Sequence, residues 1–345
     1  MMPYIDWRTT LPRIIACGIL LPALLFPLFS SNLATLSMVI LSGIWAVAAM
    51  GFALVLRTGQ FSLGQAAFMA IGGYTSAILT VKLNWPFWPS FLLAGVVAGL
   101  VAFAVGAVVL RVGGTYFSII TLALGEIVRI VAQQWEPLTK GSRGLITYPP
   151  ETIPLGFAQI DFAASAVPYY YFMVLLVAVS GVVFWRLGQS RMGGTFFSIA
   201  ANSILAEHQG IYLMKYRVMA FTVAGAFTGL AGSLYAHFMS VMTPYMLGLW
   251  ESIQIMIMSI VGGISSLVAG PIVGSVLLYD LSKYLQRLPV YGIQPLLFGG
   301  AVVAVLLFLP KGTGLIDLWS KFWKWVYNEV DYYELPEDKE DHGAP

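Results

Sequence analysis

The chain has too few charged residues to be a water-soluble protein. Asp, Glu, Lys and Arg together make up 10% of its 345 residues, whereas a soluble globular domain has about 25%. Hydrophobic residues make up 59%, and the mean hydropathy is +0.82. The composition therefore indicates an integral membrane protein. The formal net charge of +2 gives no sign of nucleic-acid binding.

Residues that form disulfides, metal sites or catalytic centres are also scarce. Cys17 is the single cysteine, and the three histidines are far apart in sequence, so we expect neither a disulfide within the chain nor a metal site. No G-x-x-x-x-G-K-[ST] loop, G-x-S-x-G elbow or H-E-x-x-H motif occurs. We therefore expect no enzyme activity and no ATP site or other cofactor in this chain.

Long apolar runs recur along nearly the whole sequence, and a membrane-spanning helix needs about 20 such residues. The first run follows two arginines like a signal peptide, but no small-x-small cleavage pattern comes after it, so we expect a retained helix. Two expected spans, 61–81 and 252–268, are rich in small residues and are candidates for broken or re-entrant helices. The ten expected spans are 14–31, 33–56, 61–81, 88–110, 115–135, 168–187, 217–240, 252–268, 271–286 and 291–309.

The positions of glycine predict helix contacts in this all-α bundle, and the positions of Lys and Arg predict its orientation in the membrane. Glycine-rich stretches predict close helix packing at 59–73, 225–232, 262–274 and 292–300. With the N-terminus inside, twelve of the 18 Lys and Arg residues fall on the inner side, five fall on the outer side, and Arg129 lies within a span. Because cytoplasmic loops carry the excess of Lys and Arg, we expect both termini in the cytoplasm.

The polar segments divide the chain further. An outer loop, 136–167, and an inner loop, 188–216, are long enough to have functions of their own. We assign 1–310 to a transmembrane domain. Residues 311–345 begin with a Trp- and Lys-rich amphipathic stretch that suits the inner interface, and they end in an acidic tail that we expect to be disordered.

Two segments of the sequence resemble one another. Residues 111–119 read RVGGTYFSI and residues 191–199 read RMGGTFFSI, which match at seven of nine positions. This similarity indicates either an internal repeat, as transporter folds often contain, or a chance likeness between two stretches rich in Gly and Phe.

Ionisable residues within a membrane span are costly and often functional. Glu126 and Arg129 lie three residues apart, so they share a helix face and can pair. They form either a polar contact on a substrate path or a self-neutralising pair near the outer end of their helix.

A second polar feature opens the span at 61–81. Residues 58–65 read TGQFSLGQ, and below they are called the polar segment. Gln60, Ser62 and Gln65, with Gly64 between them, line a path or cap a half-helix. The alternative is that the segment packs helices together through its small residues.

At these motifs the chain resembles the LivM-type permeases of the branched-chain (hydrophobic) amino-acid ABC importers. The resemblance covers about residues 35–315, and the matching motifs stand in family order. They are TGQFSLGQAAF at 58–68, LRVGGTYF at 110–117, TKGSRGL at 139–145, GLAGSLY at 229–235, VGGIS at 261–265, AGP at 269–271 and PKG at 310–312.

The resemblance implies a type II-like ABC importer permease of about ten helices in the bacterial inner membrane. It further implies a LivH-type partner permease, a periplasmic binding protein, and two cytoplasmic ATPases that would bind ATP and Mg²⁺. Candidate path residues are Gln60, Ser62, Gly64, Gln65, Glu126 and Arg129. The coupling helix that contacts an ATPase would include Ala206, Glu207 and Gly210.

The chain departs from the family pattern at two places. The inner loop usually reads like G-R-A-x-x-A-x-R, but residues 193–200 read GGTFFSIA, so the usual arginines are absent; Lys140 replaces a usual glycine in the outer loop. The first change bears on the ATPase contact, and the second on binding-protein docking or substrate. Urea, short amides and small aromatic acids remain alternative substrates. An ion-coupled secondary transporter and a purely structural subunit remain alternative functions.

Overall fold

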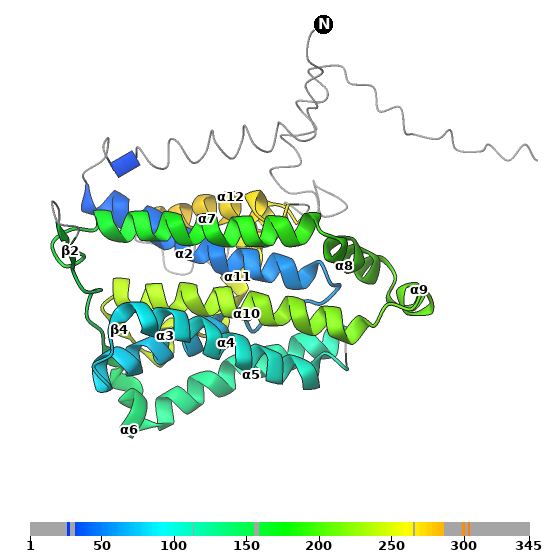
Figure 1. The fold of residues 1–345 in the computed structure, drawn as a ribbon, viewed down its shortest axis with the longest axis horizontal. Coiled ribbons are helices and arrows are strands. Elements are labelled where there is room, and N and C mark those ends of the chain that lie inside the picture. The colour runs from blue at the N-terminus through cyan, green and yellow to red at the C-terminus, as the bar shows by residue number, and fades with distance from the viewer. Residues whose placement is uncertain are drawn as a thin grey trace, which may run out of the picture.

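A computed structural model describes residues 26–27, 32–112, 114–154, 159–264, 266–285, 299–300 and 303. These residues form a bundle of long helices that lie roughly side by side (Figure 1). Most of the expected spans 14–31 and 291–309 falls outside the described residues, and so does the whole of 311–345.

Eight helices make up the body of the bundle, and their bounds agree closely with eight of the expected spans. They are α2 (Leu33–Leu56), α3 (Gln65–Lys82), α4 (Phe87–Val109), α5 (Gly114–Gln134), α7 (Val167–Gln189), α10 (Leu213–Phe238), α11 (Leu249–Gly262) and α12 (Ala269–Leu285). Within the described part, six helical segments are long and apolar enough to cross a membrane. The fold is that of an all-α membrane protein.

The two spans expected to be irregular are shorter than the apolar runs predicted. Residues 61–64 are not helical, because α3 begins only at Gln65. Residues 263 and 264 likewise lie outside α11, which ends at Gly262. The hydroxyl of Thr58 donates to the carbonyl oxygen of Val55 at 2.7 Å and so occupies a carbonyl at the end of α2, where the chain leaves the helix.

Helix α10 lies in the middle of the bundle and packs against α2, α3 and α4. Glycines make this possible, because they let the backbones of neighbouring helices approach closely. A Cβ atom on Gly72 of α3 would lie 2.1 Å from the carbonyl oxygen of Gly229 on α10, and one on Gly232 would lie 2.0 Å from that of Met69.

Glycines also allow the backbones of α11 and α12 to approach closely. A Cβ atom on Gly262 would lie 1.8 Å from the carbonyl oxygen of Gly270. Three of the four glycine-rich stretches therefore pack helices together as predicted. The fourth, 292–300, falls almost entirely outside the described residues.

The two long loops lie at opposite ends of the bundle (Figure 1). One end holds the outer-loop elements α6 (Glu136–Thr139), η1 (Gly141–Arg143), β1 (Leu145–Ile146), β2 (Ile153–Pro154) and β3 (Gln159–Ile160), together with β4 (Val241–Met242) and η2 (Pro244–Met246). Strand β1 pairs antiparallel with β4, and β2 pairs with β3. The other end holds α8 (Arg191–Ala201) and α9 (Ser203–His208).

The two similar segments of the sequence differ in structure only at their start. Residues 111 and 112 lie in a turn, and α5 begins at Gly114, which has a φ of +58°. Residues 191–193 already belong to α8, and both segments are helical over their last six positions, 114–119 and 194–199. The likeness in sequence is therefore matched by helical conformation at these positions, although α5 is a long helix and α8 a short one.

We predict that Gly72→Ala destabilises the bundle by about 1–3 kcal/mol, because the new methyl group would collide with the backbone of α10. The matched control is Gly125→Ala on α5, where a Cβ atom has no neighbour within 4 Å. Thermal unfolding of the purified, detergent-solubilised chain measures both. Equal unfolding temperatures for the two variants would contradict the close α3–α10 contact.

Candidate functional site

The polar segment lies inside the bundle. The side chains of Gln60, Ser62 and Gln65 are buried, and none is more than 2% exposed. Residues 58–64 are not helical, and Gly64 immediately precedes α3. Irregular backbone at membrane depth needs partners from the protein, because lipid offers no hydrogen bonds.

Side chains from two other helices supply those partners. The hydroxyl of Thr121 accepts a hydrogen bond from the backbone N–H of Leu63 at 3.0 Å. The hydroxyl of Ser118, also on α5, donates to the carbonyl oxygen of Phe61 at 2.6 Å. On α11, the hydroxyl of Ser252 accepts from the N–H of Ala66 at 3.1 Å. Short polar side chains of α5 and α11 thus hold the entry to α3.

Gly64 is needed because α5 approaches this backbone closely. A Cβ atom at this position would lie 2.8 Å from the carbonyl oxygen of Thr121. Beside it, the side-chain oxygen of Gln65 accepts a hydrogen bond from the hydroxyl of Thr228 on α10 at 3.2 Å. The segment is therefore tied to α5, α10 and α11 together.

Two amide atoms of this segment remain without a hydrogen-bond partner in the described part of the chain. They are Oε1 of Gln60 and Nε2 of Gln65. A buried amide atom without a partner destabilises the fold, and such atoms in native proteins call for an explanation. A polar solute or water passing through the bundle would provide the missing bonds.

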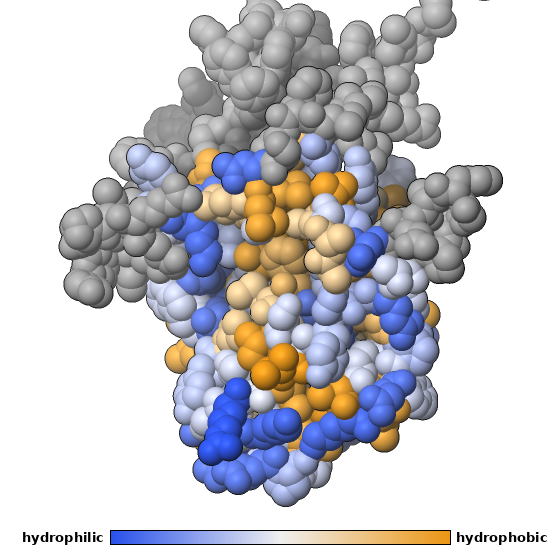
Figure 2. Space-filling view, turned by 90° about the vertical axis from the view of Figure 1, so that its left-hand side faces the viewer, coloured by the Kyte–Doolittle hydropathy of each residue, from blue (hydrophilic) through white to orange (hydrophobic). Residues whose placement is uncertain are grey.

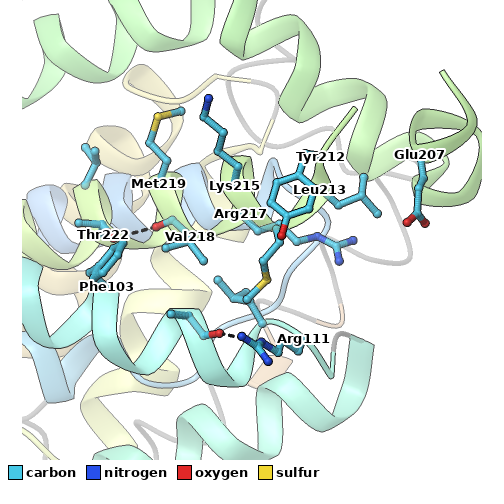
Figure 3. Close-up of a pocket in the computed structure, with 14 residues that line it drawn as sticks. Phe103, Arg111, Glu207, Tyr212, Leu213, Lys215, Arg217, Val218, Met219 and Thr222 are labelled. Atoms are coloured by element: carbon cyan, nitrogen blue, oxygen red, sulfur yellow. Dashed lines mark hydrogen bonds between the residues drawn. The ribbon is translucent and has the colours of Figure 1, made fainter. Parts of the chain in front are cut away.

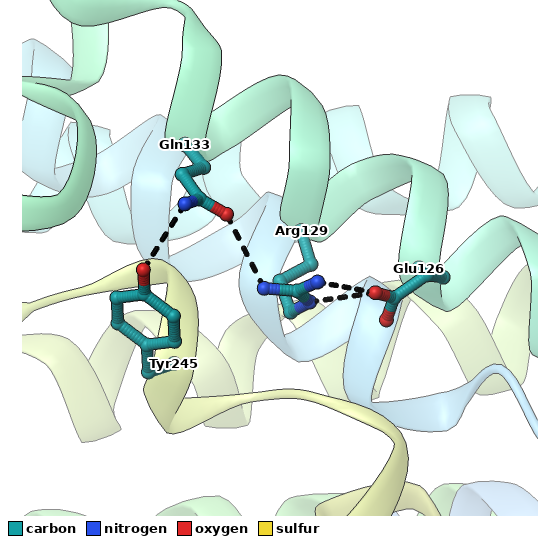
Figure 4. A network of polar contacts seen from close by, with 4 residues as sticks. All are labelled: Glu126, Arg129, Gln133 and Tyr245. Carbon is teal, nitrogen blue, oxygen red and sulfur yellow. Dashed lines mark hydrogen bonds and ion pairs between the residues drawn. The ribbon is translucent and has the colours of Figure 1, made fainter.

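The expected pair on α5 is present and belongs to a larger network (Figure 4). Arg129 forms an ion pair with Glu126, and its Nη1 donates to Oε1 of Gln133 at 3.3 Å. Nε2 of Gln133 donates to the hydroxyl of Tyr245 at 3.1 Å, which lies 3.3 Å from the hydroxyl of Ser142. The network therefore links α5 to η2 and η1 at the outer-loop end.

Most of α5 is not covered by the other residues that the structure describes. Its buried residues, among them Phe117, Thr121 and Gly125, follow the spacing of one helix face. Elsewhere it exposes large apolar residues such as Ile119 and Ile127. The side chains of Arg129 and Glu126 are 25% and 42% exposed. In a membrane, this uncovered surface meets lipid or another protein.

The structure does not join the two groups of predicted path residues by a hydrogen bond or ion pair within the described part of the chain. Helix α5 carries one group and binds the backbone of the other. Ser118 and Thr121 bind the polar segment, while Glu126 and Arg129 bind one another further along the helix. Gln133, Tyr245 and the hydroxyl partners on α5 and α11 were not predicted. Gln133 follows Arg129 by four residues, so helical spacing alone could have found it.

The predicted coupling residues lie on and just after α9, at the other end of the bundle. Asn202 caps this helix, because its side-chain oxygen accepts from the N–H of Leu205 at 3.0 Å. Ala206 is buried, so its side chain packs within the chain, whereas Glu207 is exposed. Gly210 has a φ of +82°, which favours glycine.

Three apolar side chains near these residues face outward. Phe197 of α8 is 72% exposed, and Ile204 and Leu205 of α9 are 68% and 55% exposed. We call these three residues the inner apolar patch. The sequence held a signal for it, because large apolar residues stand in a loop that leaves the membrane bundle.

The structure shows the surroundings of the two places where the sequence departs from the pattern expected of the resemblance. In the inner loop, α8 packs the side chains of Phe196 and Ile199 into the bundle. In the outer loop, Lys140 has a φ of +59°, a backbone conformation in which glycine is favoured over other residues. A glycine at position 140 would fit this turn without strain.

Helix α8 also contacts the polar segment itself. A Cβ atom on Gly59 would lie 3.1 Å from the Cα atom of Ala200, and Gly59 has a φ of +73°. Helix α8 of the inner loop thus lies directly against the link between α2 and α3.

Comparison with known proteins gives a consistent result. The family described as the permease component of branched-chain amino acid transport systems matches residues 34–309. The high-affinity branched-chain amino acid transport system permease protein LivM of Escherichia coli is 28% identical over 90% of this chain and 77% of its own length. LivM of Salmonella typhimurium gives the same identity and coverage.

A more distant relative is the galactofuranose transporter permease protein YtfT of Escherichia coli. It is 25% identical over 65% of this chain and 62% of its own length. No solved structure matches significantly.

We predict that Thr121→Val loosens the polar segment, because a buried N–H on Leu63 loses its acceptor at almost unchanged side-chain volume. A buried donor left without a partner costs about 1–3 kcal/mol. Hydrogen exchange of a peptide spanning residues 58–66 measures the effect and should become faster. Thr115→Val, at an exposed position of the same helix, is the control. Unchanged exchange in Thr121→Val would contradict the assignment.

Proposed function

This chain belongs to the family of permease components of branched-chain amino acid transport systems, and we propose that it carries a branched-chain or similar hydrophobic amino acid across the bacterial inner membrane. The family is one of transmembrane ABC importer permeases. Membership decides against an ion-coupled secondary transporter and against a purely structural subunit. Family membership is shown, whereas the substrate, the orientation in the membrane and the partner subunits given below are our proposals.

The uncovered surface of α5, with its polar network, is the observation that carries this proposal. An amino acid has an ammonium and a carboxylate group, and the pair of Glu126 and Arg129 offers the complementary charges. Gln133 and Tyr245 add neutral hydrogen-bonding groups beside them. We assign this network to the substrate path in its outer half.

Gln60, Ser62, Gly64 and Gln65 form the second part of the proposed path. Their burial in this conformation means that a solute reaches them only after helices move. Transport needs such a difference, because a substrate shifts an equilibrium only by binding two states unequally. The amide atoms of Gln60 and Gln65 that lack partners within the described chain are the groups that would bind solute in the second state.

The proposed transporter needs further subunits. A second permease, of the LivH type, would cover the exposed surface of α5. Because the sequence has no phosphate-binding loop, ATP and Mg²⁺ would bind to two separate ATPases. We place the end bearing α8 and α9 in the cytoplasm, as the Lys and Arg distribution favours.

The periplasmic binding protein would then dock at the opposite end. Figure 2 shows this end, where hydrophilic residues gather along the lower edge, the place that Figure 1 gives to α6. The exposed polar side chains of α6, η1 and the turn between them are Glu136, Lys140, Ser142 and Arg143. A polar rim of this kind suits a transient partner.

We propose that the inner apolar patch, with Glu207 beside it, docks in a groove of an ATPase. The patch offers large apolar side chains at the end of the bundle that faces the cytoplasm in this orientation. The arginines that the family resemblance implies are absent from residues 193–200 of α8, so contact through Phe197, Ile204 and Leu205 would take a larger share of the binding free energy.

We expect Arg129→Gln to lower the rate of ATP-driven leucine uptake at least about tenfold, because the path loses the group that binds the substrate carboxylate. The measurement uses proteoliposomes with the partner permease, the ATPases and the binding protein. Urea, a short amide and a small aromatic acid are tested as competitors.

The double variant Glu126→Gln/Arg129→Gln separates transport from stability. It removes both charges, so it leaves no unpaired ion, and its unfolding temperature should return toward that of the unchanged protein while uptake stays low. Recovery of uptake in the double variant would show that the pair is only structural. Uptake that persists without ATPases, driven by a proton or sodium gradient, would overturn the ABC mechanism itself.

We further expect Leu205→Asp to reduce co-purification of the ATPases at least about tenfold, because loss of a central apolar contact costs about 2 kcal/mol or more. Ile146→Asp is the matched control, since Ile146 is 68% exposed at the opposite end. Equal losses in both variants would contradict the docking site. Loss in Ile146→Asp alone would reverse the proposed orientation.

A further inference from the structure

A pocket of about 810 Å³ lies between α4 and α10, next to α9 (Figure 3). Phe103 of α4 lines it, as does Arg111, which lies two residues beyond the end of α4, and α10 lines it with Lys215 and Val223. Lys215 and Val223 are eight residues apart, which places them on one helix face. The volume is within the range of ligand pockets, about 300–1,000 Å³.

The lining of this pocket is strongly basic. Arg111, Lys215 and Arg217 are among the lining residues, and Glu207 is the single acidic one. Nε of Arg217 is buried without a hydrogen-bond partner in the described part of the chain, and Nε of Arg111 donates only to the carbonyl oxygen of Ala107 at 3.2 Å. No ion pair within the described residues involves any of these three cations.

These three cationic side chains favour the binding of an anion in the pocket. Arginine presents a planar fork of donors that matches the oxygens of a phosphate group. A buried guanidinium donor without an acceptor is unfavourable, and a bound phosphate would supply the acceptor. Figure 3 shows the side chain of Arg217 extending toward the side of the pocket where Glu207 lies, whereas that of Arg111 turns back toward the carbonyl oxygen of Ala107.

The side of the pocket at Phe103 is apolar and continues into the exposed face of α4. Phe103 is 53% exposed, and Leu92, Val96 and Leu100 are exposed on the same face toward the outer-loop end. Six residues separate Phe103 from Val109, the last residue of α4, which is about 9 Å along the helix, and Arg111 follows two residues later. An apolar strip therefore leads directly to a pair of arginines.

We propose that this pocket binds an anionic phospholipid of the inner leaflet. The phosphate group lies at Arg111 and Arg217, with Lys215 at the rim, and an acyl chain follows the apolar strip from Phe103 toward Leu92. Basic pockets between transmembrane helices on the cytoplasmic side bind anionic headgroups in this manner. The choice of leaflet rests on the orientation proposed above, whereas the binding itself does not depend on transport.

The test compares lipid binding by the full-length permease with and without the two arginines. The purified protein, and its complex with partner subunits, is titrated with phosphatidylglycerol and with phosphatidylcholine, and bound lipid is counted by native mass spectrometry. We expect Arg111→Gln/Arg217→Gln to weaken phosphatidylglycerol binding about tenfold or more and to leave phosphatidylcholine binding unchanged.

Control variants exclude a general effect of charge or folding. Arg191→Gln removes an exposed cation from α8 at the same end of the bundle, outside the pocket lining, and should bind phosphatidylglycerol normally. The single variant Arg111→Gln changes an exposed residue just beyond α4, so it tests the site even if the double variant misfolds. It should weaken binding by a smaller factor.

Several outcomes would overturn the proposal. Equal weakening by Arg191→Gln would reduce the effect to general surface charge. Displacement of the lipid by inorganic phosphate at constant ionic strength would assign the pocket to a soluble anion. Exclusion of phosphatidylglycerol by the bound ATPases would make the pocket part of a protein interface. Loss of lipid binding with normal uptake would leave the proposed transport function intact.

Discussion

The hydrogen bonding of the polar segment is the constraint on which the rest of the structure depends. Residues 58–64 interrupt the helices inside a bundle that lipid surrounds, so other side chains must bind their backbone. Ser118 and Thr121 fix α5 against the segment, and Ser252 fixes α11. The directions of α3, α5 and α11 are therefore set together, and the exposed surface of α5 follows from that arrangement.

Hydrophobicity and glycine placement predicted most of this fold. Apolar runs located eight helices to within a few residues, because a spanning helix needs a minimum apolar length. Three glycine-rich stretches located the close contacts, of which Gly72 against Gly229 is one. The same runs placed the start of α3 too early, at residue 61. Hydropathy does not register that Phe61 and Leu63 are held in irregular backbone by hydroxyl groups nearly 60 residues away.

Sequence patterns predicted separate groups of candidate site residues, but not how the structure arranges these groups relative to one another. Helical spacing found Glu126 with Arg129, and could have added Gln133, because all three lie on one helix. Tyr245 lies 112 residues beyond Gln133, so no local pattern connects them. The resemblance predicted coupling residues that fall on and just after α9, and burial divides the residues of this helix: Ala206 packs inward, while Ile204 and Leu205 face out. Such a division depends on tertiary packing that a single sequence does not reveal.

The ion pair of Arg129 and Glu126 has an electrical consequence. Moving one elementary charge through a membrane potential of 100 mV involves about 2.3 kcal/mol. The pair carries no net charge, and neither does a zwitterionic amino acid. If the network releases a zwitterionic amino acid to the other side of the membrane, that step therefore moves almost no net charge through the membrane field. Under the proposed transport function, we therefore expect the cycle to be insensitive to the membrane voltage.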